Sequence, residues 1–310
     1  MTCYHPLVGY RSRAGRNPNG RWPLVFNTSE GYIDLPVTMK CGKCIGCRLA
    51  HSKEWAVRCV HEASLHTNNC FVTLTYRDEA LPEYGSLNKR HFVLFMKSLR
   101  KKFGAGIRFF HCGEYGEKLR RPHHHACIFN HQFEDKKLWT VRRGVKLYRS
   151  PSLEKIWKHG YSSIGDVNFQ TAAYCARYIM KKINGPLALE HYNTFDKTTG
   201  EIFKELVPEY ITMSRCPGIA KEWFKKWSSD VYPSDMVKLF NQVPCKPPRY
   251  YDNLYDIENP VQMKIIKQRR LKKFNSENNT SQRLKARKTV LQLKTKSLKR
   301  SYEQEKNSNE

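Results

Sequence analysis

Residues 121–129 read Arg-Pro-His-His-His-Ala-Cys-Ile-Phe and carry the strongest structural signal in this sequence. An apolar run of this kind is typical of a β-strand, in which successive side chains point to opposite faces of the sheet. His123 and His125 therefore share one face of the predicted strand, and His124 points to the other. Two imidazoles on one face can bind one divalent cation when a neighbouring strand supplies a further ligand.

The neighbouring strand is predicted just upstream, over residues 107–112, and a Gly-Glu-Tyr-Gly segment at 113–116 joins the two as a hairpin. Glu114 and Glu117 are both within reach across such a hairpin. We choose Glu114 as the carboxylate that completes a metal site with His123 and His125. The alternative is a chance cluster of exposed histidines, because a histidine usually has a structural role.

A helix is predicted from about residue 172 to 183, before the Gly-Pro pair that ends it. Tyr174, Tyr178 and Lys181 are spaced i, i+4 and i+7, so they lie on one helical face. A tyrosine oxygen can attack the phosphorus of a phosphodiester when a metal ion and a nearby lysine offset the negative charge. The product would be a 5′-phosphotyrosine, which keeps the energy needed to reseal the strand. The alternative is that the tyrosines only pack in an aromatic-rich protein.

The remaining pattern mixes strands with helices, which predicts an α+β fold with a mainly antiparallel central sheet and flanking helices. Residues 71–76, Phe-Val-Thr-Leu-Thr-Tyr, form a further strand in which Phe71, Thr73 and Thr75 share a face. Residues 1–40 are rich in Gly, Pro, Asn and Arg and are expected to be irregular. Other elements are expected as helices at 49–63, 92–103 and 151–160 and a strand at 164–169.

The charge is strongly basic, with 55 Lys and Arg against 28 Asp and Glu and a net charge of +27. This balance favours a polyanionic partner, either nucleic acid or an anionic membrane surface. No run approaches the length of about 18 apolar residues that a membrane helix needs, and the N-terminus lacks the apolar segment of a signal peptide. We therefore expect no membrane partner and a cytoplasmic location.

Three regions are predicted along the chain. Residues 1–66 hold a cysteine cluster and a helix, residues 67–240 hold the histidines and tyrosines, and residues 241–310 form a basic tail that is partly disordered. From residue 261 onward the tail carries 15 Lys and Arg and 4 Glu. It is either a basic arm on nucleic acid or a solvated segment without a partner.

The cysteine cluster reads Cys41-Gly-Lys-Cys44-Ile-Gly-Cys47, within a total of 11 cysteines. An odd number with uneven spacing suits free thiols or metal ligands better than a disulfide framework. The three cysteines could bind a structural Zn²⁺ with Cys3 or His5 as the fourth ligand. An iron–sulfur site and plain reduced thiols remain open as alternatives, and no catalytic role is assigned.

Taken together, these motifs resemble those of the replication initiators of small single-stranded DNA phages, the gokushovirus branch of the Microviridae. The initiators belong to the HUH endonucleases, where U is a hydrophobic residue between two ligand histidines. Residues 71–76, 123–125 and 174–181 are similar to the three motifs of that superfamily, in the same order. His124 occupies the U position, which leaves open whether it reaches outward, acts as a ligand or packs as a neutral residue. The resemblance also covers Cys41–Arg48, Gly113–Gly116 and Met213–Ile219.

The resemblance implies an HUH-like sheet and rolling-circle replication of the double-stranded replicative form. One tyrosine would cut the origin strand and stay on its 5′ end, and the second would attack the regenerated origin so that the circle closes. His123, His125 and Glu114 would bind Mg²⁺ or Mn²⁺, and Lys181 would steady the charge on the scissile phosphate.

The partners implied are phage single-stranded and replicative-form DNA in the cytoplasm of a bacterial host. The sequence has no P-loop motif, so a host helicase and DNA polymerase would be needed. Two other functions remain open: a transposase or relaxase with the same chemistry, and a zinc-stabilised nucleic-acid-binding protein without enzymatic activity.

Overall fold

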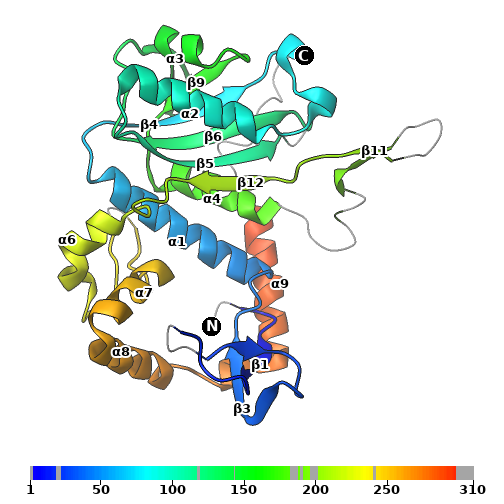
Figure 1. Ribbon diagram of the computed structural model, residues 1–310, viewed down its shortest axis with the longest axis vertical. Coiled ribbons are helices and arrows are strands. Elements are labelled where there is room, and N and C mark those ends of the chain that lie inside the picture. The colour runs from blue at the N-terminus through cyan, green and yellow to red at the C-terminus, as the bar shows by residue number, and fades with distance from the viewer. Residues whose placement is uncertain are drawn as a thin grey trace. The chain divides into compact units, whose positions relative to one another are not determined.

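The computed structural model describes most of the chain, namely residues 3–18, 22–116, 119–142, 144–181, 188, 191–195, 202–239 and 242–297. The chain forms two compact units (Figure 1). The larger unit comprises residues 51–269, and the smaller one comprises residues 1–50 together with residues 270–299.

A seven-stranded sheet organises the larger unit, and its strand order is β12-β5-β6-β4-β9-β8-β7. Every pairing in it is antiparallel. The strands are β4 (Asn69–Thr75), β5 (Arg108–Tyr115), β6 (Pro122–Phe129), β7 (Lys137–Arg142), β8 (Val145–Arg149), β9 (Ser162–Gly165) and β12 (Tyr210–Met213). A separate two-stranded ladder pairs β10 (Asn193–Phe195) with β11 (Ile202–Glu205).

Helices cover both faces of this sheet (Figure 1). Residues of α1 (Ile45–Ala63) and α4 (Phe169–Lys181) share one buried apolar cluster with the sheet, and those of α2 (Lys89–Phe103) and α3 (Pro151–Ile156) share another. The central strands β4 and β6 are buried on both faces, which explains their nearly continuous apolar composition. The predicted α+β fold with a mainly antiparallel central sheet is confirmed.

Three further helices follow the sheet: α6 (Lys221–Val231), α7 (Arg249–Glu258) and α8 (Pro260–Lys272). Tyr251, Met263 and Ile266 are buried in the same cluster as α1 and α4. The sequence predicts a partly disordered tail from residue 241, and the structure instead places residues 242–269 in the larger unit. These three apolar side chains are the physical reason, because their burial holds α7 and α8 on the core.

The smaller unit contains a three-stranded sheet of order β2-β1-β3 and the helix α9 (Ser281–Ser297). Its strands are β1 (Leu7–Ser12), β2 (Leu24–Val25) and β3 (Gly31–Met39). The prediction of irregular structure for residues 1–40 is therefore wrong. Glycine and proline within β3 hide the strand pattern, and Gly31 is needed there because a Cβ would lie 2.4 Å from Cβ of Tyr10.

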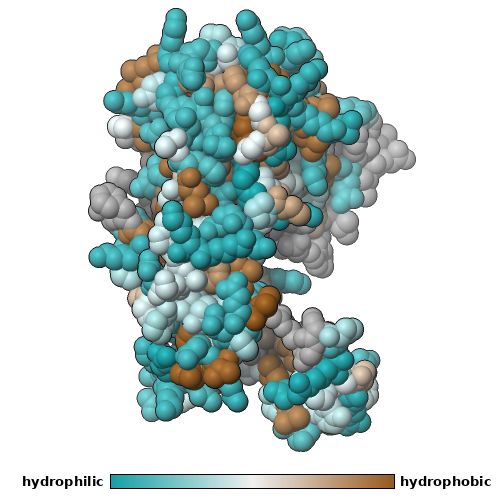
Figure 2. Space-filling view, turned by 60° about the vertical axis from the view of Figure 1, so that its left-hand side comes forward, coloured by the Kyte–Doolittle hydropathy of each residue, from teal (hydrophilic) through white to brown (hydrophobic). Residues whose placement is uncertain are grey.

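Short 3₁₀ turns complete the described elements, at Asp78–Ala80, Glu83–Gly85 and Glu277–Asn279. Hydrophilic side chains dominate the face shown in Figure 2, with apolar residues scattered among them. Within the described residues, none of the helices combines the length and the apolar composition that crossing a membrane requires.

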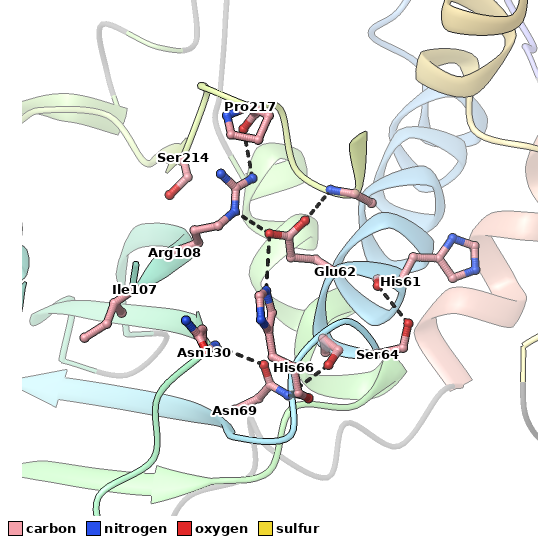
Figure 3. A network of polar contacts seen from close by, with 12 residues as sticks. His61, Glu62, Ser64, His66, Asn69, Ile107, Arg108, Asn130, Ser214 and Pro217 are labelled. Atoms are coloured by element: carbon pink, nitrogen blue, oxygen red, sulfur yellow. Dashed lines mark hydrogen bonds and ion pairs between the residues drawn. The ribbon is translucent and has the colours of Figure 1, made fainter. Parts of the chain in front are cut away.

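A buried carboxylate joins α1 to the segment that follows β12 (Figure 3). Glu62 accepts hydrogen bonds from the guanidinium of Arg108, at the start of β5, and from the backbone N–H of Ala220 (2.5 Å). Arg108 also donates to the carbonyl of Pro217 (2.8 Å). The contacts assign a structural role to residues 213–219, the last of the motifs quoted from the sequence.

Replacing Arg108 with methionine should lower the free energy of unfolding by about 3–5 kcal/mol, because it leaves Glu62 as a buried, unpaired charge. Denaturant unfolding of the variant measures this change. The matched control is Arg90→Met at an exposed position of α2, where we expect a change within about 0.5 kcal/mol. Equal, small effects at both positions would contradict the role assigned to the Glu62–Arg108 pair.

Candidate active site

The registers of β4, β5 and β6 bring the predicted ligands to one face of the sheet. Glu114 of β5 lies directly opposite His123 of β6, and Thr73 of β4 lies opposite His125. Residues that pair directly across a ladder point to the same face. The segment 113–116, predicted as a turn, mostly belongs to β5, because pairing continues to Tyr115. Glu114 is therefore held in the ladder and not in a loop.

Glu114, His125 and Tyr174 form the centre of the site. The Nε2 atom of His125 lies 2.7 Å from Oε1 of Glu114, and the Tyr174 hydroxyl donates to the same oxygen at 3.1 Å. The three residues are only 7%, 4% and 7% exposed, in the order His125, Glu114, Tyr174. The rings of Tyr174 and His125 meet edge-on with their centroids 4.9 Å apart. Helix α4 thus presents a phenol to a carboxylate and an imidazole at the edge of a buried site.

Backbone and side-chain contacts orient the two imidazoles. The Nδ1 atom of His123 donates to the carbonyl of Arg121 (2.7 Å), so Nε2 carries the lone pair of the neutral ring. The Nδ1 atom of His125 is hydrogen-bonded to the Thr73 hydroxyl (3.0 Å). The two rings are nearly parallel, at 8°, with centroids 6.3 Å apart. Contacts of this kind to the second ring nitrogen are common for histidines that bind metals.

The donor set of imidazole nitrogen and carboxylate oxygen suits Mn²⁺ or Mg²⁺. His125 and Glu114 fit such an ion, because a cation can replace the proton that now lies between Nε2 and Oε1. His123 shares their face but stands further out. In the described part of the chain, donor atoms from three or more candidate ligands come within 4.8 Å of one another at the cysteine cluster and not at the histidines.

His124 points to the opposite face of the sheet, as the strand period predicts. It is fully buried, with Nε2 2.9 Å from the Tyr76 hydroxyl and Nδ1 3.1 Å from Nε2 of His111. Burial lowers the pKa of His124 to about 3, so the ring is neutral at physiological pH. Of the three roles left open for this residue, the structure shows a neutral, hydrogen-bonded packing residue.

The predicted cysteine site lies in the smaller unit. The sulfur atoms of Cys3, Cys41, Cys44 and Cys47 all lie within 4.8 Å of one another. His5, the alternative fourth ligand, instead has its Nε2 atom 3.0 Å from Nζ of Lys288. The structure therefore brings together four cysteines, including one that the local spacing does not contain.

Comparison with known proteins gives the family. Residues 69–183 match the family model described as replication-associated protein ORF2. The chain is also 32% identical over 277 residues to the replication-associated protein ORF2 of Spiroplasma virus 4, covering 83% of this chain and 81% of that protein. The chain belongs to the replication-associated protein family. This membership confirms the resemblance to phage replication proteins and assigns the chain a role in phage replication.

Two further relatives agree with this family. The replication-associated protein VP4 of Bdellovibrio phage phiMH2K is 32% identical over 270 residues, which cover 84% of this chain and 79% of that protein. The replication-associated protein ORF4 of Chlamydia phage 1 is 33% identical over 153 residues, which cover 46% and 38%. No solved structure matches this replication-associated protein.

Two residues at the site of the replication-associated protein were not predicted. Thr73 orients His125, and its place on that face follows from the alternation of residues 71–76. Arg177 lies three residues after Tyr174 on α4, and its Nε atom is buried with no hydrogen-bond partner among the described residues. The spacing i, i+3 places it beside Tyr174, and this spacing was the available signal.

Three predicted candidates cannot be located. Tyr178 and Lys181 belong to α4 by their backbone, but their side chains lie outside the described residues. Glu117, the alternative carboxylate, also lies outside them.

Proposed function

We propose that this replication-associated protein cuts and reseals one strand of phage DNA through a 5′-phosphotyrosine intermediate. The contact that carries the proposal is the hydrogen bond from the Tyr174 hydroxyl to Glu114 (3.1 Å), beside His125. It pairs a nucleophile with a proton acceptor in a buried site. A tyrosine that served only for packing would not need to donate to a buried carboxylate that also contacts a histidine.

In the proposed step, the Tyr174 oxygen attacks phosphorus and its proton passes to the Glu114 carboxylate. A bond forms between the tyrosine oxygen and phosphorus, and the bond from phosphorus to the 3′ oxygen breaks. The 3′ oxygen takes up a proton and leaves as a free hydroxyl. In the reverse direction that hydroxyl attacks the phosphotyrosine, so the strand is resealed without a nucleotide cofactor.

The surrounding residues serve this step. His123, His125 and Glu114 would hold Mg²⁺ or Mn²⁺, which when bound supplies positive charge to the scissile phosphate. Arg177 is placed to donate to phosphate oxygens through its buried guanidinium. Tyr178 would be the second nucleophile and Lys181 a further cation, as the motif resemblance implies.

Two tyrosines on one helix would allow cutting and closing to alternate, as rolling-circle replication requires. The DNA partners would be the single-stranded and replicative forms, with a helicase and polymerase supplied by the bacterial host in its cytoplasm. The basic surface supports DNA binding: residues 1–50 and 270–299 carry 17 Lys and Arg and 3 Asp and Glu.

A direct test incubates the full-length protein with Mn²⁺ and single-stranded fragments of its phage genome, labelled at the 3′ end. The protein should stay on the 5′ end of the cut strand, so the label should move into a protease-sensitive band on a denaturing gel. DNA that is bound but never cut would instead favour the zinc-stabilised binding protein, and cutting with no covalent band would exclude the tyrosine mechanism.

The variant Thr73→Val should raise the Mn²⁺ concentration needed for half-maximal adduct formation by about 10–100-fold, since it removes the hydroxyl that orients His125. Valine has nearly the shape of threonine, so the strand should be preserved. The matched control is Thr140→Val in β7, remote from the histidine-bearing strand in the sheet order. The same Mn²⁺ requirement in both variants would show that Thr73 does not position the ligand.

A further inference from the structure

We propose that Cys3, Cys41, Cys44 and Cys47 bind one structural zinc ion, and that this ion supplies the folding free energy of the N-terminal sheet. The proposal concerns residues 3–50 and does not depend on the DNA-cutting mechanism. It rests on the positions of the sulfurs, on the backbone amides directed at them and on the lack of another buried core among the described residues of this region.

The sulfur positions fit a tetrahedral ion. A Zn–S bond of about 2.3 Å sets neighbouring sulfurs of a tetrahedron about 3.8 Å apart. The four sulfurs here all lie within 4.8 Å of one another. Cys3 precedes β1, Cys41 and Cys44 follow β3, and Cys47 lies in the first turn of α1. One ion would therefore tie both ends of the β1–β3 pair to the start of the helix.

Backbone amides treat these sulfurs as acceptors. The N–H of Cys41 donates to Sγ of Cys3, the N–H of Cys44 donates to Sγ of Cys41, and the N–H of Tyr4 donates to Sγ of Cys44, each at 3.3 Å. A thiol is a weak acceptor, whereas a thiolate bound to a metal accepts strongly. Three amides aimed into one group of four sulfurs are the pattern that metal-bound thiolates need.

The N-terminal sheet has little else to hold it. Leu7, Val8, Ile33 and Leu35 are 42%, 53%, 59% and 43% exposed. Among the described residues up to 50, the cysteines form the buried apolar cluster, with Tyr4 packed against them. A region of this size that buries so little apolar surface usually needs a metal or disulfides to fold. Metal binding would then be folding free energy, as in zinc fingers.

The same geometry argues against the two alternatives from the sequence. A four-iron cluster would stand between the sulfurs and need them further apart than this group allows. Plain reduced thiols would leave the three amide contacts and the convergence of Cys3 on the other cysteines without a purpose. Four protein ligands also leave no open position, so the site is structural and not catalytic.

Metal analysis of the purified full-length protein tests the proposal first. We expect about one zinc ion per chain. The variant Cys47→Ser should lose most of this zinc, and Cys216→Ser, which changes an exposed cysteine outside the cluster, should keep it. Zinc that is absent from the wild type, iron in its place, or equal zinc in both variants would overturn the assignment.

A second measurement on the wild type covers the case in which Cys47→Ser does not fold. After a zinc chelator is added, trypsin should cut within residues 3–50, for example at Arg11 or Arg13, and the fragment that starts near residue 51 should stay resistant. Adding zinc back should restore protection. Cobalt in place of zinc should give the visible absorption of tetrahedral thiolate coordination. Full protection of the N-terminal region without metal would overturn the proposal.

Discussion

The double variant Tyr174→Phe with Tyr178→Phe should bind single-stranded origin DNA and form at least about 10³-fold less covalent adduct than the wild type. Phenylalanine keeps the ring that Tyr174 sets edge-on against His125 and Phe71. It removes the oxygen that would attack phosphorus, so the chemistry is lost while the packing of α4 on the sheet is retained. Denaturing gels of 3′-labelled DNA measure the adduct, and gel shifts measure binding.

The matched control for this double variant is Tyr161→Phe, at a position that is 61% exposed. It should form adduct at the wild-type rate. Single variants keep one phenol, so only the double variant tests the chemistry as a whole. Covalent adduct in the double variant would refute the assignment of both tyrosines.

Replacing His123 and His125 with alanine should lower metal-dependent cleavage by at least about 10²-fold, because the ion that offsets phosphate charge would lose its imidazole ligands. DNA binding should fall much less, since it depends on Lys and Arg contacts with phosphates. The readout is the initial rate of adduct formation across a Mn²⁺ titration, compared with binding at the same salt concentration.

The control for the histidines is His191→Ala, because His191 lies outside the sheet that carries the site. Its Mn²⁺ dependence should equal that of the wild type. Excess chelator should stop the wild-type reaction, and Mn²⁺ should restore it. Turnover of the wild type in excess chelator would remove the metal from the mechanism.

Much of the catalytic face could be predicted from short stretches of sequence. The run of residues 121–129 is a strand, and the alternation along it separates His124 from His123 and His125 as expected. The helical spacing after residue 172 likewise predicts that Tyr174 lies on the face of α4 that meets the sheet. These predictions succeed because side-chain direction along a strand or helix follows from the period of the element.

Other features did not follow from local pattern. The Gly-Glu-Tyr-Gly segment looks like a turn, yet pairing extends through Glu114 to Tyr115. The basic segment after residue 241 looks disordered, yet α7 and α8 bury Tyr251, Met263 and Ile266. In both cases distant parts of the chain supply the packing or pairing energy, and local composition does not report it.

The order of the residues alone was enough to assign the class of fold, the faces of the three histidines and the family motifs, because each depends on neighbours within a few positions. The folded chain was needed to show that Glu114 contacts both His125 and Tyr174, since this depends on the β5–β6 register and on how α4 packs. It was also needed to bring Cys3 to Cys41, which lies 38 positions away. Contacts between residues so far apart are made by long-range pairing and burial, which no local period encodes.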